Sequence, residues 1–168
     1  MLSTPVALAQ VVPMDGFHLA NAELQRLGLA QRKGAPETFD SAGYIALLHR
    51  LREQQPHERI YAPEFLRELE EPIAGAIGVA AQTRLVITEG NYLLLEQGHW
   101  AEVAGLLDAV WYVEPDEPLR LQRLLRRHMA FGRSEQAARD WIASTDEPNA
   151  RLIEASRQRA DRVLRWND

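Results

Sequence analysis

The sequence contains no cysteine, which excludes disulfide bonds, thiolate metal sites and a cysteine nucleophile. No window approaches the ~18 consecutive apolar residues of a membrane span. The first ten residues also lack the basic start and the apolar core of an export signal. From these absences we expect a cytoplasmic protein that has no membrane partner.

An excess of positive charge is also missing, because 19 basic side chains stand against 24 acidic ones and the net charge is −5. This balance argues against nucleic acid or an anionic membrane as the main partner, so any anion site must be local. The 168 residues, 46% of them hydrophobic, are enough for a sizeable core. We therefore expect one globular domain over residues 1–168.

Two common catalytic motifs are absent. The histidines have no His-Glu-x-x-His or similar spacing, so a zinc site is not supported. No Gly-x-Ser-x-Gly elbow is present either, which argues against a serine hydrolase. The five histidines are His18, His49, His57, His99 and His128.

The most informative stretch runs from Arg84 to Leu95. It opens with an uncharged, β-branched run at residues 85–87, which predicts a central strand covered on both faces. Glu89 follows where the chain must turn, and Gly90 allows close approach of backbone or ligand. Ligands of open α/β sheets bind at the carboxyl ends of strands, so Glu89 is a candidate for metal or phosphate chemistry. The alternative is that Glu89 caps the next turn or pairs with an arginine.

A second strand is predicted over Val6–Pro13, and it also ends in an acid, Asp15. Asp-Gly is a common turn dipeptide, so Asp15 viewed alone could be only a turn residue. A functional role for Asp15 is favoured when it is considered together with Glu89. Two strands that each end in a carboxylate at the same sheet edge can supply a general base and a metal ligand.

The remaining chain alternates helices and strands, which predicts a doubly wound α/β fold. Asp40 or Ser41 can cap one helix, and Asp116 can cap another that runs to about Phe131. The acidic, proline-bracketed stretch Tyr61–Pro72 reads as a loop. The other expected elements are helices at 21–27, 100–107, 134–143 and 147–159 and strands at 109–113 and 162–166.

The helix after Asp116 has an apolar face, predicted to point inward, and a basic one. The apolar residues are Leu121, Leu124, Leu125 and Met129. The basic residues are Arg120, Arg123, Arg126, Arg127 and the trailing Arg133, with no acid between Pro118 and Ser134. Such a patch on an acidic protein suggests an anionic ligand, although a solvated arginine face is the alternative.

Four motifs together resemble the P-loop small-molecule kinases of the uridine kinase, pantothenate kinase and phosphoribulokinase group. They are Val12–His18, Arg32–Asp40, Tyr61–Pro63 and Thr88–Leu94. The nearest likeness is to bacterial nucleoside/nucleotide kinase-like proteins, often labelled as fructose transport system kinases. The resemblance implies an α/β fold, a P-loop NTPase-like three-layer sandwich with a mainly parallel sheet.

The resemblance also implies roles. Asp15 would receive the proton of the substrate hydroxyl, and Glu89 would hold Mg²⁺. The region about 117–134 would be a lid in which Arg123 is catalytic and Arg123 and Arg127 bind ATP. The acceptor, a small molecule, would be bound by His18, Arg32, Lys33, Phe39, Tyr61 and Asn91.

One departure from the family is large: the sequence contains no Gly-x-x-x-x-Gly-Lys-Ser/Thr loop, which cradles and contacts the nucleotide phosphates. Relative to the family, the fold would lack its first strand, P-loop and first helix. The missing strand would lie between those at Leu85 and Ala109, and its absence predicts exposed edges and self-association, as in a homodimer. Two hypotheses remain: an ATP-dependent kinase for a hydroxyl of a nucleoside, sugar or pantothenate-like metabolite, or a truncated or degenerate relative that binds a metabolite or partner without catalysis.

Overall fold

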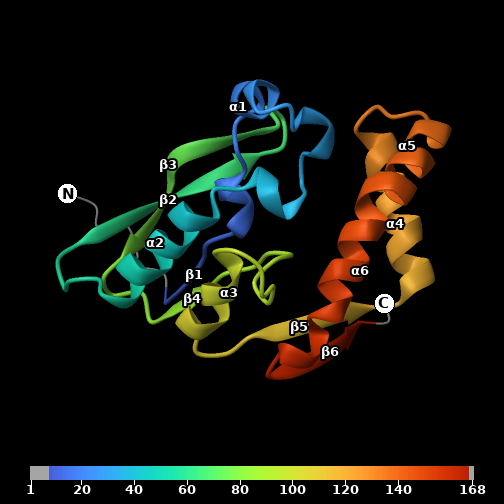
Figure 1. The fold of residues 1–168 in the computed structure, drawn as a ribbon. Coiled ribbons are helices and arrows are strands. Elements are labelled where there is room, and N and C mark those ends of the chain that lie inside the picture. The colour runs from blue at the N-terminus through green and yellow to red at the C-terminus, as the bar shows by residue number, and fades with distance from the viewer. Residues whose placement is uncertain (1–7, 167–168) are drawn as a thin grey trace. The chain divides into compact units, whose positions relative to one another are not determined.

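The computed structural model describes residues 8–166. Its contacts divide the chain into two compact units, one ending at Leu106 and the other beginning at Leu107. Each unit combines helices with a parallel pair of strands (Figure 1). The single domain expected over residues 1–168 stays a prediction.

The first unit contains the parallel pair formed by β1 (Ala9–Val11) and β4 (Leu85–Ile87). Both strands were expected, although Val6 lies outside the described residues. The prediction that β4 is covered on both faces was wrong, because Leu85 is 53% and Ile87 46% exposed. Within residues 8–166, β1 is the only strand that pairs with β4. That a neighbouring strand is absent, and that the protein self-associates through an exposed edge, both stay predictions.

Two long antiparallel strands, β2 (Arg59–Leu66) and β3 (Glu71–Ala80), form a hairpin in the first unit. The expectation of a loop over Tyr61–Pro72 was therefore wrong. Ile60 and Ala62 are buried and alternate with exposed residues, as in a strand with one covered face. Pro63 falls where the register shifts between Ala62 and Glu64. A bulge of this kind tolerates proline because no ladder hydrogen bond is needed there.

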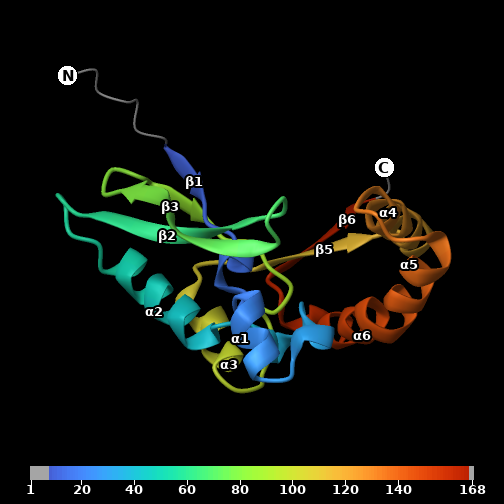
Figure 2. The ribbon, with the colours of Figure 1, turned by 90° about the horizontal axis from the view of Figure 1, so that it is seen from above.

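Three helices lie along one side of this hairpin (Figure 2). They are α1 (Asn21–Arg26), α2 (Ser41–Arg52) and α3 (Trp100–Val103). The prediction of a cap for α2 is confirmed, because Asp40 Oδ1 accepts from the backbone N–H of Gly43 at 2.8 Å. Short 3₁₀ turns cover Met14–Phe17, Ala30–Arg32, Pro36–Thr38 and Ala104–Leu106. A core cluster joins α2 to the hairpin and to the residue after β1; it consists of Val12, Leu47, Ile60, Ala62 and Val79.

The second unit pairs β5 (Trp111–Pro115) in parallel with β6 (Arg162–Trp166). Asp116 caps the next helix as predicted, since its Oδ1 accepts from the N–H of Leu119 at 3.0 Å. The helices are α4 (Glu117–Ala130), α5 (Glu135–Trp141) and α6 (Glu147–Ala155), with a 3₁₀ turn at Arg157–Arg159. A π-helical segment, Ile142–Asp146, joins α5 to α6 without the expected break.

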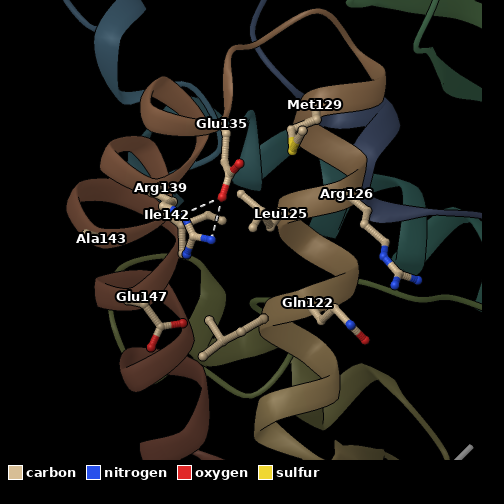
Figure 3. Close-up of a pocket in the computed structure, with 10 residues that line it drawn as sticks. Gln122, Leu125, Arg126, Met129, Glu135, Arg139, Ile142, Ala143 and Glu147 are labelled. Atoms are coloured by element: carbon tan, nitrogen blue, oxygen red, sulfur yellow. Dashed lines mark hydrogen bonds and ion pairs between the residues drawn. The ribbon is translucent and has the colours of Figure 1, made fainter.

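The apolar face of α4 is not buried, which corrects the expectation that it points into a core. No residue of α4 is fully buried, and Met129 is 43% exposed. Leu121, Leu125 and Met129 instead line an open groove of about 630 Å³ beside Ile142 (Figure 3). Between residues 8 and 166, no helix has both the length and the apolar character needed to cross a membrane.

Candidate active site

Two carboxylates meet at the carboxyl end of the β1–β4 pair. The paired residues end at Val11 and Ile87, and beyond them the N–H of Met14 donates to the carbonyl oxygen of Glu89 at 2.8 Å. Asp15 therefore follows one strand and Glu89 the other, at a common edge. The structure thus brings together the two acids that the sequence singled out.

Burial and two charged neighbours act on the Glu89 carboxyl. Desolvation by the surrounding protein raises the pKa of Glu89, although its side chain reaches solvent, and the charge of Asp15 raises the pKa further. Arg67 opposes this shift, with its Nη2 3.8 Å from Asp15 Oδ2. The site therefore holds two acids and one compensating cation.

Arg67 is a site residue that the sequence reasoning missed, because it lay inside the stretch read as a loop. It stands in the turn between β2 and β3, where Glu70 has a positive φ of 53°. The carbonyl oxygen of Glu70 accepts hydrogen bonds from Asn21 Nδ2, at 3.2 Å, and from Lys33 Nζ. These bonds anchor the turn that carries Arg67.

Glycines follow both acids, and each is required by close packing. A Cβ at Gly16 would lie 2.3 Å from the carbonyl oxygen of Pro63. A Cβ at Gly90 would lie 2.5 Å from Cβ of Met14. Both distances are shorter than any tolerable contact. A side chain at Gly16 would push the Asp15 segment away from β2, and one at Gly90 would push the two carboxylate-bearing segments apart.

His18 stands in an aromatic wall beside Asp15. Its ring centre is 4.0 Å from that of Phe39 and 4.7 Å from that of Phe65. Its Nδ1 is 2.8 Å from the carbonyl oxygen of Asp15, which can only accept, so Nδ1 carries the hydrogen. Burial lowers the pKa of His18, so the neutral ring is favoured, with Nε2 able to accept a hydrogen bond.

The two basic residues predicted to bind the acceptor are engaged within the protein. Lys33 Nζ donates to Asn21 Oδ1 at 2.7 Å and lies 5.2 Å from the centre of the Phe65 ring. Burial lowers the pKa of Lys33, and the nearby acids Glu70 and Glu71 oppose that effect. Arg32 Nη2 pairs with Glu37 Oε1 at 2.5 Å.

The last two predicted acceptor residues lie at the surface of the first unit. Tyr61 is on β2 and is 56% exposed. Asn91 is exposed in the turn that follows Gly90. Their roles in acceptor binding stay predictions.

The arginines of α4 belong to the second unit, and several have partners. Arg120 Nη2 pairs with Glu147 Oε1 at 2.5 Å, so an acid from α6 supplies the partner that α4 itself lacks. Arg133, which follows the end of α4, stacks on Trp141 with its Cζ 4.1 Å from the ring centre. Arg123, Arg126 and Arg127 are exposed. The exposed basic face is therefore smaller than predicted, because Arg120 and Arg133 are engaged by other residues of the second unit.

The acids at the end of β1 and β4 fit a magnesium ion in kind and number. Mg²⁺ is usually held by one or two carboxylates together with substrate phosphates and water. Among the described residues no group of three or more histidines, cysteines or acids forms a complete metal cage. Glu89 and Asp15 could thus supply the carboxylate ligands of such a site, and the remaining ligands would be substrate phosphates and water.

Comparison with known proteins places the chain among kinases. No protein-family model matches it. It is 34% identical over 145 residues to the ATP-dependent kinase-like protein notR' of Aspergillus versicolor, with 82% of this chain and 84% of that protein covered. It is 30% identical over 163 residues to a Schizosaccharomyces pombe protein provisionally named as a uridine kinase, with 94% of this chain and 69% of that protein covered.

Solved structures agree. A Silicibacter sp. TM1040 protein, provisionally described as a fructose transport system kinase, matches with a TM-score of 0.85 and 42% identity, covering 93% of this chain and 74% of that one. Saccharomyces cerevisiae YFH7, provisionally described as a P-loop containing kinase with a circular permutation, matches with a TM-score of 0.85 and 26% identity. That match covers 97% of this chain and 59% of YFH7. The chain therefore belongs to the P-loop small-molecule kinase family and has its α/β fold.

Proposed function

We propose that this protein transfers the γ-phosphoryl group of ATP to a hydroxyl of a small metabolite. The observation that carries the proposal is the meeting of Asp15 and Glu89 at the end of the β1–β4 pair. Catalysis of phosphoryl transfer consists mainly of positioning and electrostatic stabilisation, and two converging acids serve both needs. The kinase relatives support the same reaction class.

In the proposed reaction Asp15 orients the acceptor hydroxyl and takes its proton. The acceptor oxygen then forms a bond to the γ-phosphorus, while the bond from that phosphorus to the β,γ-bridging oxygen breaks and ADP leaves. Glu89 would hold Mg²⁺, and the ion would neutralise charge on the phosphates. Arg67 keeps the Asp15 carboxylate oriented before the acceptor arrives.

The other predicted residues have supporting roles in this proposal. His18, with its neutral ring between Phe39 and Phe65, forms part of the wall against which the acceptor lies. Arg123 and Arg127 bind nucleotide phosphates from the exposed side of α4, because guanidinium groups pair well with phosphate oxygens. The acceptor remains a nucleoside, a sugar or a pantothenate-like molecule, and a cytoplasmic location stays a prediction.

A second candidate function is metabolite binding without phosphoryl transfer. The observation in its favour is that the sequence has no Gly-x-x-x-x-Gly-Lys-Ser/Thr loop, the element that contacts the phosphates in P-loop enzymes. In this case the aromatic wall around His18 would bind its ligand while ATP binding stayed weak or absent.

Two measurements on the 168-residue chain separate the candidates. Calorimetry with Mg-ATP, and separately with each member of a panel of nucleosides, sugars and pantothenate, reports binding, and a coupled assay for ADP over the same panel reports transfer. ADP formation that depends on one acceptor supports the kinase. Acceptor binding without ADP formation supports the second candidate, and a chain that binds neither ligand contradicts both.

A further inference from the structure

A short hydrogen-bond chain ties β1 to β4 just beyond their last paired residues. Thr88 Oγ1 donates to the carbonyl oxygen of Val12 at 2.8 Å. The hydroxyl of Tyr44 lies 2.7 Å from the same Thr88 Oγ1. Because a carbonyl oxygen can only accept, the Thr88 proton points to Val12, and Tyr44 must donate to Thr88. The direction of both bonds is thereby determined.

These hydrogen bonds lie just beyond the carboxyl ends of β1 and β4, next to the two acids. The strand ladder ends at Val11 and Ile87, and one more backbone bond joins the N–H of Val12 to the carbonyl oxygen of Ile87 at 2.9 Å. Thr88 immediately precedes Glu89 in sequence. The Thr88 side chain therefore ties the strands together at the point where the two acid-bearing segments leave them.

Tyr44 anchors the chain of bonds in the core. It comes from α2 and has no exposed surface. Its ring meets Phe17 edge-on with centres 5.3 Å apart, and it lies 6.0 Å from the ring centre of Trp100. Phe17 belongs to the same 3₁₀ turn as Asp15. Tyr44 thus contacts the segment of Asp15 through its ring and the segment of Glu89 through its hydroxyl.

We propose that Tyr44 and Thr88 are positioning residues that set the separation of the Asp15 and Glu89 carboxylates. The inference rests on the proposed function, for which this separation must suit both the acceptor hydroxyl and the metal-bound phosphates. Catalytic groups must be held within about 0.5 Å of their productive geometry, and residues behind them supply that restraint. Neither residue touches the reactants in this scheme; both act through the acids.

Conservative substitutions isolate the hydroxyl groups. Thr88→Val keeps the side-chain shape and removes both hydrogen bonds. Thr88→Ser restores the hydroxyl, and Tyr44→Phe removes only the outer donor. Thr83→Val is the matched control, since Thr83 precedes β4 at its opposite end.

The kinetic expectation is a loss in kcat and not in substrate binding. Thr88→Val should lower kcat by about tenfold or more, with the KM values for ATP and acceptor within about twofold of wild type, because a misplaced acid slows transfer more than binding. Thr88→Ser should recover wild-type kcat. Tyr44→Phe combined with Thr88→Val should be no worse than Thr88→Val alone, since both belong to one chain of bonds. A normal kcat in Thr88→Val, or equal impairment in Thr88→Ser, overturns the proposal.

A structural measurement keeps this proposal separate from the kinase hypothesis. Absence of turnover in the wild type counts against the proposed function alone. The separation of the Asp15 and Glu89 carboxylates in crystals of wild type, Thr88→Ser and Thr88→Val then tests the positioning role directly. We expect a change of about 1 Å in Thr88→Val and none in Thr88→Ser, and about 1 Å is the scale at which misplacement affects catalysis. If Thr88→Val does not fold, Tyr44→Phe takes its place, and an unchanged separation overturns the proposal.

Discussion

The backbone N–H of Met14 donates to the carbonyl oxygen of Glu89 at 2.8 Å, beyond the last paired residues of the two strands that carry them. The side chain of Met14 also covers Gly90, where an added Cβ would lie 2.5 Å from Met14 Cβ. The two acid-bearing segments are thus bound to each other directly. Their spacing depends on this contact as well as on the sheet.

Gly90→Ala should therefore destabilise the protein by about 1–3 kcal/mol, the usual cost of forcing an extra methyl group into close packing. Gly105→Ala is the control, because a Cβ at Gly105 meets no atom within 4 Å. Urea denaturation of both variants measures the difference. Equal stability of the two variants would show that Met14 moves aside without cost.

Asp15→Asn should lower kcat by ~10²-fold or more, because an amide cannot take the proton of the acceptor hydroxyl. The KM for ATP should change little. Asp140→Asn, which alters an exposed acid on α5, is the control for loss of one negative charge. Turnover at the wild-type rate in Asp15→Asn would remove Asp15 from the catalytic role.

Glu89→Gln should raise the Mg²⁺ concentration needed for half-maximal activity while acceptor binding stays near wild type. The reason is that a neutral amide is a much weaker magnesium ligand than a carboxylate. Titration of activity with Mg²⁺ gives the answer, with Glu102→Gln, a 62% exposed side chain on α3, as control. An unchanged Mg²⁺ response would leave Glu89 as a cap or ion-pair partner.

Replacing Arg123 and Arg127 together by alanine should raise the KM for ATP and weaken its dependence on ionic strength. Two fewer cations then attract the phosphates, so the electrostatic part of ATP binding, which is the part that salt reduces, becomes smaller. Arg26→Ala and Arg50→Ala, both at exposed ion pairs, are the controls. Normal ATP use combined with a much lower Tm in the double variant would assign these arginines to structure.

His18 should make the protein less stable in mild acid. Burial holds the pKa of folded His18 below its ordinary value of 6.5. As the pH falls below that value, the unfolded chain takes up a proton that the folded ring resists, so folding stability falls. Unfolding free energies at about pH 7.5 and about pH 5.5 measure this loss, which His18→Gln should reduce. His57→Gln, at an exposed position, should leave the dependence unchanged.

Local signals in the sequence were sufficient for several elements. The uncharged run at Leu85–Ile87 and the caps Asp40 and Asp116 lie where they were predicted. The reason is that strand runs and helix caps depend on residues a few positions apart. The meeting of Asp15 and Glu89 also followed from sequence, because parallel strands place their carboxyl ends at one edge.

Features that depend on contacts between distant segments could not be predicted from local sequence signals. The β2–β3 hairpin was missed because Pro63 and the acids around it are typical of a loop. The alternation of buried and exposed residues along β2 becomes visible only when the strand is packed against the core. Arg67 was missed with it, although it lies 3.8 Å from Asp15. The engagement of Lys33 by Asn21 and Glu70 could not be inferred either, since those partners lie 12 and 37 residues away.

The sequence by itself determined that two acids end two strands, that a basic amphipathic helix follows Asp116 and that the chain resembles kinases. Only the tertiary structure decided that Arg67 compensates Asp15 and that Tyr44, from α2, holds Thr88 against Val12. The physical reason is range. A strand end or a cap is set by neighbouring residues, whereas a charge's counterion and a hydroxyl's partner are selected when packing brings remote segments within about 3–4 Å.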